Sequence, residues 1–202
     1  TDSFTVVVAN TNDAPTLANA ILDGSVAEDS AYSLDVSTMC ADVDVGDTMS
    51  HTLSGAPSTL SVASGVISGT PVNADVGTHT ITVTCADSAN ATVGDTYILT
   101  VTNVNDAPTI SSNAVTAATE DSAYSYTATA SDVDAGDTLT LSGTTIPTWM
   151  SFNATTGVLT GTPTNSEVGS HAVVITASDA AGANVTDSFT VVVANTNDAP
   201  TL

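Results

Sequence analysis

Apolar and polar residues alternate in short runs along the chain, which is the pattern of β-strands with one buried face. Ile81, Val83 and Cys85 alternate with three threonines, and Phe189 and Val191 occupy alternate positions in the same way. Turn residues separate these runs, no long segment shows a helical period, and the abundance of threonine and valine favours strands. The pattern predicts an all-β protein built from sandwiches of short strands.

The sequence also repeats itself. Asn-Asp-Ala-Pro-Thr occurs at 12–16, 105–109 and 197–201, and residues 1–17 are identical to residues 186–202. Such self-similarity is typical of arrays of one structural unit. The predicted order is the last strand of a preceding repeat (1–10), a linker (11–17), a first repeat (18–102), a linker (103–109), a second repeat (110–194) and a linker to the next repeat (195–202).

Composition adds an unusual charge balance. The 202 residues include 22 Asp and Glu but no Lys or Arg, which gives a formal net charge of −22. Nucleic acids and anionic membrane surfaces need cationic partners, so neither is expected to bind. No apolar run approaches the roughly 20 residues of a membrane-spanning helix, so membrane insertion is not expected. An acidic chain without Lys or Arg favours an external cation.

The acidic residues and the linker asparagines occupy matched positions of the two repeats. They lie near the start of each repeat, directly after predicted strands, or in the linkers. Calcium takes six to eight oxygen ligands of these kinds. The alternative is that Asp and Asn make turns and caps. We expect a turn role for Asp47 and Asp137, which each follow a glycine.

The order of these motifs resembles the cadherin repeat. A glutamate near the repeat start is followed by Asp-x-Asp, a late Asp and Asn-x-Asn-Asp-Ala-Pro. Pro-Thr-Trp-Met-Ser-Phe at 147–152 and Gly-Val-Leu-Thr-Gly-Thr-Pro at 157–163 resemble the dystroglycan-type and bacterial cadherin-like variants. The resemblance covers nearly all of residues 11–202. It implies tandem Greek-key β-sandwich (cadherin/immunoglobulin-like) repeats in a linear array, with Ca²⁺ where consecutive repeats meet.

The resemblance also implies a ligand set. At the central boundary it comprises Glu28, Asp75, Asn103, Asn105, Asp106, Asp132, Asp134 and Asp179. The matching residues at the other boundaries are Asn10, Asn12, Asp13, Asp42, Asp44 and Asp87, and then Glu120, Glu167, Asn195, Asn197 and Asp198. The linkers begin with Asn where the family usually has Asp, and end in Ala where it has Asn. The family's Asp-Arg-Glu segment is absent, so Asp75 and Glu167 are assigned by neighbourhood alone, and fewer ions per boundary than in the family are expected.

The two cysteines occur only in the first repeat. Cys40 and Cys85 align with Ala130 and Ala177, on strands that correspond to two facing strands of immunoglobulin-like cores. We expect a disulfide between the sheets, with two buried free thiols as the alternative. A disulfide indicates an oxidising compartment, and so an extracellular or cell-surface location. Zinc binding is not expected, because no set of Cys and His shows ligand spacing.

These features favour a calcium-rigidified spacer or fibre segment of a secreted or cell-surface repetitive adhesin or filament. The alternative is a carbohydrate- or protein-binding adhesive module, and a calorimetric glycan screen with and without calcium separates the two. An enzyme is not expected, since the chain has no Lys or Arg for anion stabilisation and no Ser-His-Asp arrangement. Neighbouring repeats are the expected partners. Residues 1–10 could also complete the sandwich of another molecule by strand addition, which would give head-to-tail self-assembly.

Overall fold

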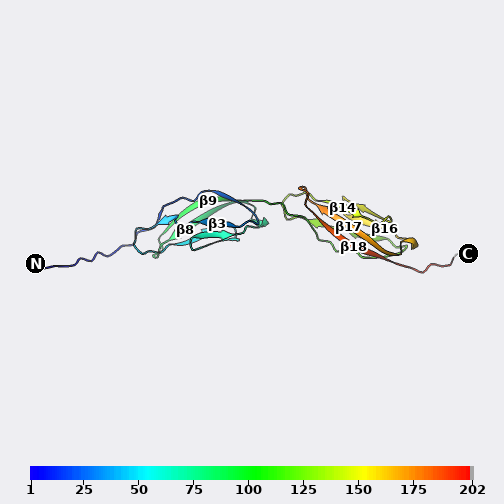
Figure 1. Cartoon of the computed structure of the whole chain (residues 1–202), viewed down its shortest axis with the longest axis horizontal. Helices are drawn as coiled ribbons and strands as arrows, with labels where there is room; N and C mark the ends of the chain where they lie inside the picture. The colour runs from blue at the N-terminus through cyan, green and yellow to red at the C-terminus, as the bar shows by residue number, and fades with distance from the viewer. Residues whose placement is uncertain (201–202) are drawn as a thin grey trace. The chain divides into compact units, whose positions relative to one another are not determined.

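The expected β-strands are present in both repeats. The computed structural model describes residues 1–200, and the chain divides into two units, Thr1–Val104 and Asn105–Leu202. Each unit holds one β-sandwich (Figure 1). Within residues 1–200 no helix is long and apolar enough to cross a membrane.

The first unit contains nine strands and a single 3-10 turn. Its elements are β1 (Thr16–Leu17), β2 (Gly24–Ala27), β3 (Tyr32–Asp35), β4 (Cys40–Ala41), β5 (Ser50–Ser54), β6 (Leu60–Ala63), β7 (Val66–Gly69), η1 (Asn73–Asp75), β8 (Gly77–Ala86) and β9 (Thr92–Thr102). A four-stranded sheet has the order β2-β9-β8-β5, a three-stranded sheet has the order β3-β7-β6, and β1 pairs with β4. All pairs are antiparallel except β2 and β9.

The second unit repeats this topology strand for strand. Its elements are β10 (Thr109–Ile110), β11 (Ala117–Thr119), β12 (Tyr124–Thr127), β13 (Ala130–Ser131), β14 (Thr140–Thr145), β15 (Met150–Asn153), β16 (Val158–Gly161), η2 (Asn165–Glu167), β17 (Gly169–Ser178) and β18 (Asn184–Ala194). The sheets are β11-β18-β17-β14 and β12-β16-β15, with β10 paired to β13. The prediction of tandem all-β sandwiches is confirmed.

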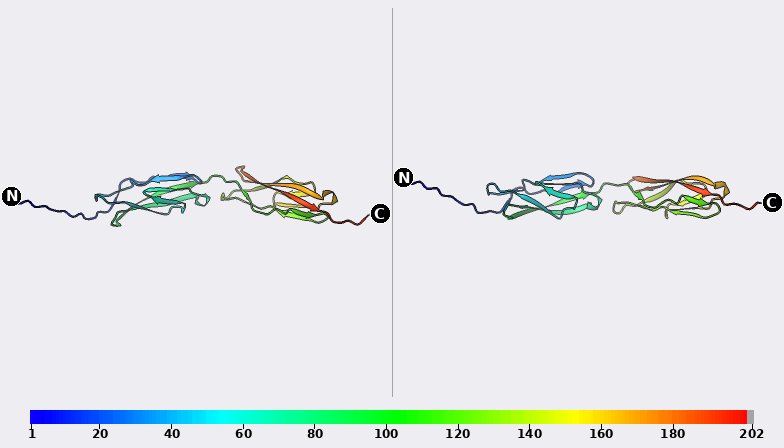
Figure 2. Two further views of the ribbon diagram at one scale, coloured as in Figure 1. Left: turned by 60° about the horizontal axis from the view of Figure 1, so that its bottom comes forward. Right: turned by 90° about the horizontal axis from the view of Figure 1, so that it is seen from below.

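The core of each unit lies between its two larger sheets, which the two views of Figure 2 show face to face. In the first unit Ile81 and Val83 of β8 and Leu99 of β9 are fully buried against Ile67 of β7. The threonines between them stay partly or fully exposed, as the alternation predicts. Each such side chain contributes about 2 kcal/mol by leaving water.

Aromatic side chains fill the core of the second unit. Trp149 packs edge-on against Tyr124 and His171, with ring centroids 5.9 Å and 5.7 Å away. Burial raises the pKa of Tyr124 to about 12, and its hydroxyl donates a hydrogen bond to the carbonyl of Val115. The first repeat has Thr59 where Trp149 stands, so the two cores are filled differently on one backbone.

The Gly-Thr-Pro motif in each repeat has a steric cause. A Cβ atom at Gly69 would collide with the carbonyl oxygen of Thr59, and one at Gly161 would collide with that of Trp149. Both glycines end the central strand of a three-stranded sheet. Only glycine lets the neighbouring chain approach this closely.

Residues 1–10, which the sequence assigns to the last strand of a preceding repeat, form no strand within this chain. Phe4 and Val8 are each 87% exposed. The identical residues 186–194 lie in β18, where β17 and β11 supply hydrogen-bond partners on both sides. A strand of this sequence therefore depends on a sandwich that holds it. The short strands β1 and β10 begin inside the stretches that the sequence assigns to linkers.

Candidate metal centre

Three carboxylates meet at one end of the first sandwich. Oxygen atoms of Asp42, Asp47 and Asp87 all lie within 4.8 Å of one another. The loop after β4 brings the first two together, because the Asp44 backbone N–H donates to Asp42 Oδ1 at 2.8 Å and Gly46 takes a left-handed turn with φ +93°. Asp87 follows β8 and is buried. The hydroxyl of Ser88 donates to Asp47.

The preceding linker binds to these acidic residues. The side-chain amide of Asn10 and the backbone N–H of Asp13 donate to the two oxygens of Asp44, at 2.7 Å and 2.8 Å. The Asn12 amide donates to Asp87 Oδ2 at 3.0 Å. This amide, with smaller help from the backbone N–H groups of the following turn, holds the pKa of Asp87 below its ordinary value although burial raises it. Asp87 is therefore an anion at neutral pH.

The second repeat builds a related arrangement, in which Asp134 and not Asp179, the counterpart of Asp87, completes the triplet. Oxygens of Asp132, Asp134 and Asp137 lie within 4.8 Å of one another, and the backbone N–H of Asp106 donates to Asp134 at 2.8 Å. The Asn105 amide donates to Asp179 at 2.7 Å and is the main cause of the lowered pKa of Asp179. The hydrogen bonds from the linker to the acidic residues thus recur in both repeats.

A buried glutamate lies at the opposite end of each sandwich. Glu28 and Glu120 are each 1% exposed. Glu28 Oε1 accepts the Val104 backbone N–H at 2.9 Å, and Glu120 Oε1 accepts the backbone N–H of Thr196. Each glutamate thereby binds the chain that leaves its own sandwich. The second carboxylate oxygen of each is buried and accepts no hydrogen bond.

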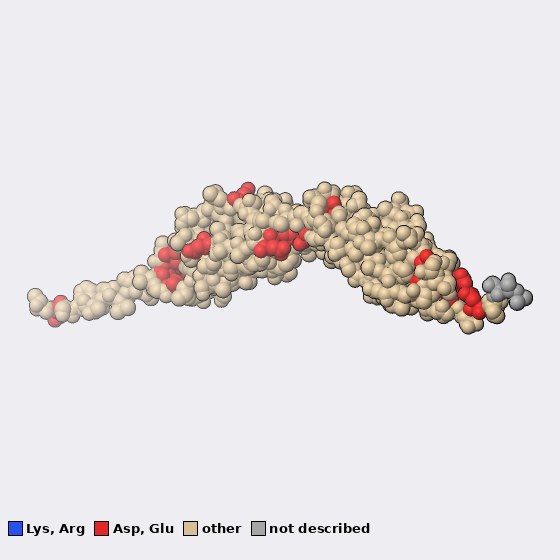
Figure 3. Space-filling model, turned by 45° about the vertical axis from the view of Figure 1, so that its right-hand side comes forward, with Lys and Arg blue, Asp and Glu red and all other residues tan. Residues whose placement is uncertain are grey.

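Buried oxygens without a donor are concentrated at these sites. Residues 1–200 contain seven fully buried side-chain N or O atoms without a hydrogen-bond partner, and six are carboxylate oxygens: those of Asp42, Asp47, Asp132, Asp137, Glu28 and Glu120. Leaving such a group unsatisfied costs about 1–3 kcal/mol, and more when it is charged. The chain has no Lys or Arg to neutralise them, and Figure 3 shows the acidic side chains gathered in patches on a surface without basic ones. The chemistry of this donor set fits a hard cation such as Ca²⁺.

Two expected ligands have local partners instead. The Asp75 side chain accepts hydrogen bonds from Thr59 and from the backbone of Val72, and so closes the η1 turn. Glu167 does the same at η2 with Thr164. These bonds lower the pKa of both carboxyls. Neither residue belongs to the carboxylate triplets described above.

The linker residues differ in their contacts. Asn195 accepts a long, 3.5 Å hydrogen bond from Asn165, while Asn197 donates to the neighbouring carbonyl of Asp198. Asn103 and Asp198 are exposed.

Asp47 and Asp137, for which the sequence predicts a turn role, lie among the clustered carboxylates in the structure. Both also make the turn, since their N–H groups donate to the carbonyls of Asp44 and Asp134. The signal was the shared Asp-Val-Asp-x-Gly-Asp spacing.

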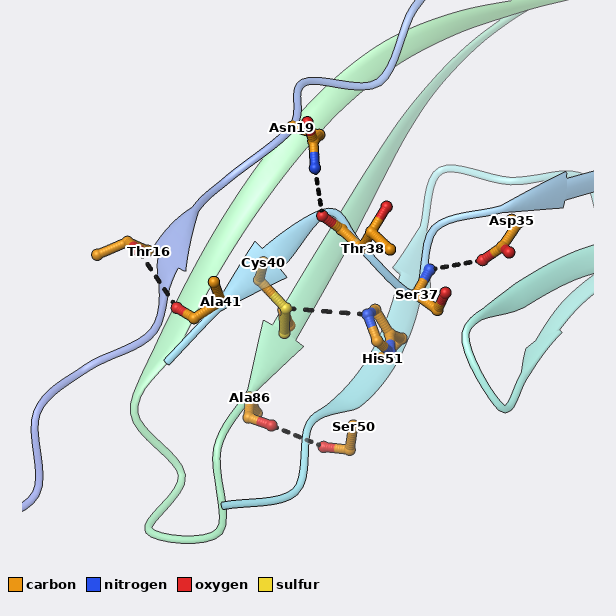
Figure 4. The surroundings of a disulfide bond; sticks show 11 residues. Thr16, Asn19, Asp35, Ser37, Thr38, Cys40, Ala41, Ser50, His51 and Ala86 are labelled. Atoms are coloured by element: carbon orange, nitrogen blue, oxygen red, sulfur yellow. Dashed lines mark hydrogen bonds between the residues drawn. A yellow bond between two sulfur atoms is a disulfide. The ribbon is translucent and has the colours of Figure 1, made fainter. Parts of the chain in front are cut away.

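A disulfide joins Cys40 of β4 to Cys85 of β8 in the first repeat, with the Cα atoms 6.5 Å apart. It links the short β1–β4 pair to the four-stranded sheet. His51 of β5 lies directly opposite Cys85, and its Nε2 is 3.9 Å from Cys40 Sγ (Figure 4). No spacing in the sequence predicts this proximity.

Two β-sandwiches of one topology in tandem define a chain of immunoglobulin-like, cadherin-like repeats. Residues 14–102 and 107–194 match the family model described as "Putative Ig domain". The chain belongs to this family, with one member domain in each repeat.

Known proteins agree with this assignment. The serine-rich adhesin for platelets of Staphylococcus aureus is 31% identical over 144 residues, which cover 70% of this chain but only 6% of that protein. Mouse cadherin-23 domains EC22-24 share the fold with a TM-score of 0.54 and 19% identity, over 91% of this chain and 65% of that one. An endo-fucoidan hydrolase of glycoside hydrolase family 107 matches at 25% identity over 91% of this chain and 29% of its own, with a TM-score of only 0.43. The comparisons indicate a surface or extracellular protein.

Proposed function

We propose that this chain is a calcium-binding spacer segment of a repetitive surface adhesin, in which bound Ca²⁺ stiffens the array. The observation that carries the proposal is the set of fully buried carboxylate oxygens without a donor, in a chain that has no Lys or Arg. Crowded carboxylates repel by about 1 kcal/mol per close pair even at a water-like dielectric constant. Divalent cations turn this repulsion into attraction.

The proposed calcium ligands at the start of each repeat are the carboxylates that cluster within that repeat. Asp42, Asp47 and Asp87 hold an ion in the first repeat, and Asp132, Asp134 and Asp137 hold one in the second. Asp44 and Asp179 are positioned beside them by hydrogen bonds from the linker. Glu28 and Glu120, each with one free buried oxygen, are the ligands that a repeat offers at its other end.

The array would be stiffened because these acidic residues also bind the linker between the repeats. Val104 donates its N–H to Glu28 within the first unit, and the next residue, Asn105, binds Asp179 within the second. Ions that bind these carboxylates together with linker oxygens restrict rotation about the linker. The sharing of one ion by adjoining repeats is a prediction from the cadherin resemblance. The adhesin likeness supports a role in which length and stiffness are the selected properties.

Small-angle X-ray scattering tests the stiffening. With calcium in excess we expect the profile of one extended particle, and with a chelator the profile of two sandwiches on a flexible linker. The Asp132→Asn/Asp134→Asn variant should show the flexible profile in both buffers. Identical profiles for the native chain with calcium and with chelator would contradict the proposal.

Head-to-tail assembly is a second candidate, favoured by the exposed apolar side chains of residues 1–10. These residues have the sequence of β18, so they carry the side-chain pattern of a strand and could pair with an open sheet edge in another copy. Sedimentation velocity at increasing concentration should show oligomers that disappear when residues 1–10 are removed. A native chain that stays monomeric at high concentration would exclude this assembly.

A further inference from the structure

The first repeat contains a second cluster of metal-ligating side chains, made of nitrogen and sulfur. Cys40 Sγ, Cys85 Sγ and one ring nitrogen of His51 all lie within 4.8 Å of one another. Both cysteines are buried and His51 is half-buried. The three residues come from β4, β8 and β5, so the fold and not a local sequence motif assembles them.

The second repeat has other residues at all three matched positions. In matched register, Cys85 pairs with His51 across β8 and β5, while Ala177 pairs with Leu141 across β17 and β14. Cys40 aligns with Ala130. The alanine–leucine set packs as plain core, with Ala177 fully buried and Leu141 against the apolar cluster. Leucine fills this position beside the alanine in the second repeat, so packing alone does not require a histidine there. The histidine beside the cysteine pair therefore indicates a role in addition to filling space.

We infer that, when the disulfide is reduced, Cys40, Cys85 and His51 form a binding site for Zn²⁺. Reduction by an external thiol or phosphine adds two electrons and two protons, which gives two thiols. Zinc binding then displaces both protons, and the two thiolates neutralise the charge of the ion inside the core. The fourth position is left to water.

The distances in the structure suit this ion. Tetrahedral zinc, with bonds of about 2.3 Å to sulfur and about 2.0 Å to nitrogen, sets sulfur and nitrogen roughly 3.5 Å apart. Cys40 Sγ and His51 Nε2 are 3.9 Å apart. His51 is therefore almost in place, and only the two sulfurs have to separate. The metal and the disulfide are alternative cross-links between the same strands.

The test uses the whole chain with calcium in excess, so that the carboxylates are saturated. Co²⁺ is added as a spectroscopic probe to protein reduced by a phosphine under argon, and is then displaced by Zn²⁺. We expect one Co²⁺ per chain with a thiolate-to-cobalt charge-transfer band, and no such band in the oxidised protein. Binding to carboxylates gives no thiolate band, so failure of this inference is separate from failure of the calcium proposal.

The second repeat supplies the control variants. His51→Leu copies Leu141 and should weaken binding at least tenfold, while Cys40→Ala/Cys85→Ala copies Ala130 and Ala177 and should abolish the band. A reduced native chain without a thiolate band, or a His51→Leu variant that binds as tightly as the native chain, would overturn the inference. Zinc should also raise the unfolding midpoint of the reduced first repeat, and an unchanged midpoint would count against it as well.

Discussion

Replacing Cys40 and Cys85 together by alanine is expected to lower the free energy of unfolding of the first repeat by about 2–4 kcal/mol. The disulfide joins residues 45 positions apart and so restricts the unfolded chain. Alanine fits both sites, because Ala130 and the fully buried Ala177 occupy them in the second repeat. The loss therefore measures the cross-link and not a steric defect.

Urea unfolding can follow the two repeats separately. The single tryptophan, Trp149, lies in the second repeat, so its fluorescence reports that repeat alone. Far-ultraviolet circular dichroism reports both. In the double variant we expect an earlier dichroism transition from the first repeat and an unchanged fluorescence transition. A native chain kept in reductant without zinc should behave like the variant, and coincident unfolding of native and variant protein would refute the prediction.

Much of this fold was predictable because each repeat shows the alternation of apolar and polar residues and the same motifs in the same order. The alternation of Ile81 and Val83 with threonine predicted a strand with one buried face, and both side chains are fully buried. Repeated motifs then predicted two sandwiches of one kind. The state of residues 1–10 was not predictable, because the same sequence forms a strand only where β17 and β11 flank it. Strand formation is a property of the partners as well as of the segment.

The sequence predicts that the candidate site consists of acidic residues and asparagines, but not which of the acidic residues belong to it. Asp75 and Asp47 illustrate the difference. From sequence both are acidic residues near turns, but the Asp75 side chain closes the η1 turn while the Asp47 side chain lies beside Asp42 and Asp87. Whether a carboxylate satisfies its own turn or is left with a free buried oxygen depends on the folded loop. The Asp-Val-Asp-x-Gly-Asp spacing indicates that Asp47 lies near Asp42, but the burial and hydrogen bonding of each oxygen cannot be read from residue type.

Removal of calcium is expected to lower the thermal stability of both repeats. An ion that binds only the folded state, present at 100 times its dissociation constant, adds about 2.7 kcal/mol. For a domain of this size each kcal/mol moves the midpoint by about 4–8 °C, so chelation should lower each midpoint by roughly 10–20 °C. Scanning calorimetry with calcium and then with a chelator measures both transitions.

The variant Asp134→Asn separates ion binding from simple charge. In calcium it loses a ligand, so its second repeat should unfold several degrees earlier than the native one. In chelator it loses one of three crowded negative charges, while the asparagine oxygen can still accept the N–H of Asp106, so its stability should equal or exceed that of the native chain. Asp23→Asn removes the same charge at an exposed site of the first repeat, where Asp23 accepts the Ile98 N–H, and should change neither midpoint noticeably. The reversal of sign between the two buffers is what ion binding requires. A variant that is equally destabilised in both would show that Asp134 acts through its hydrogen bonds alone.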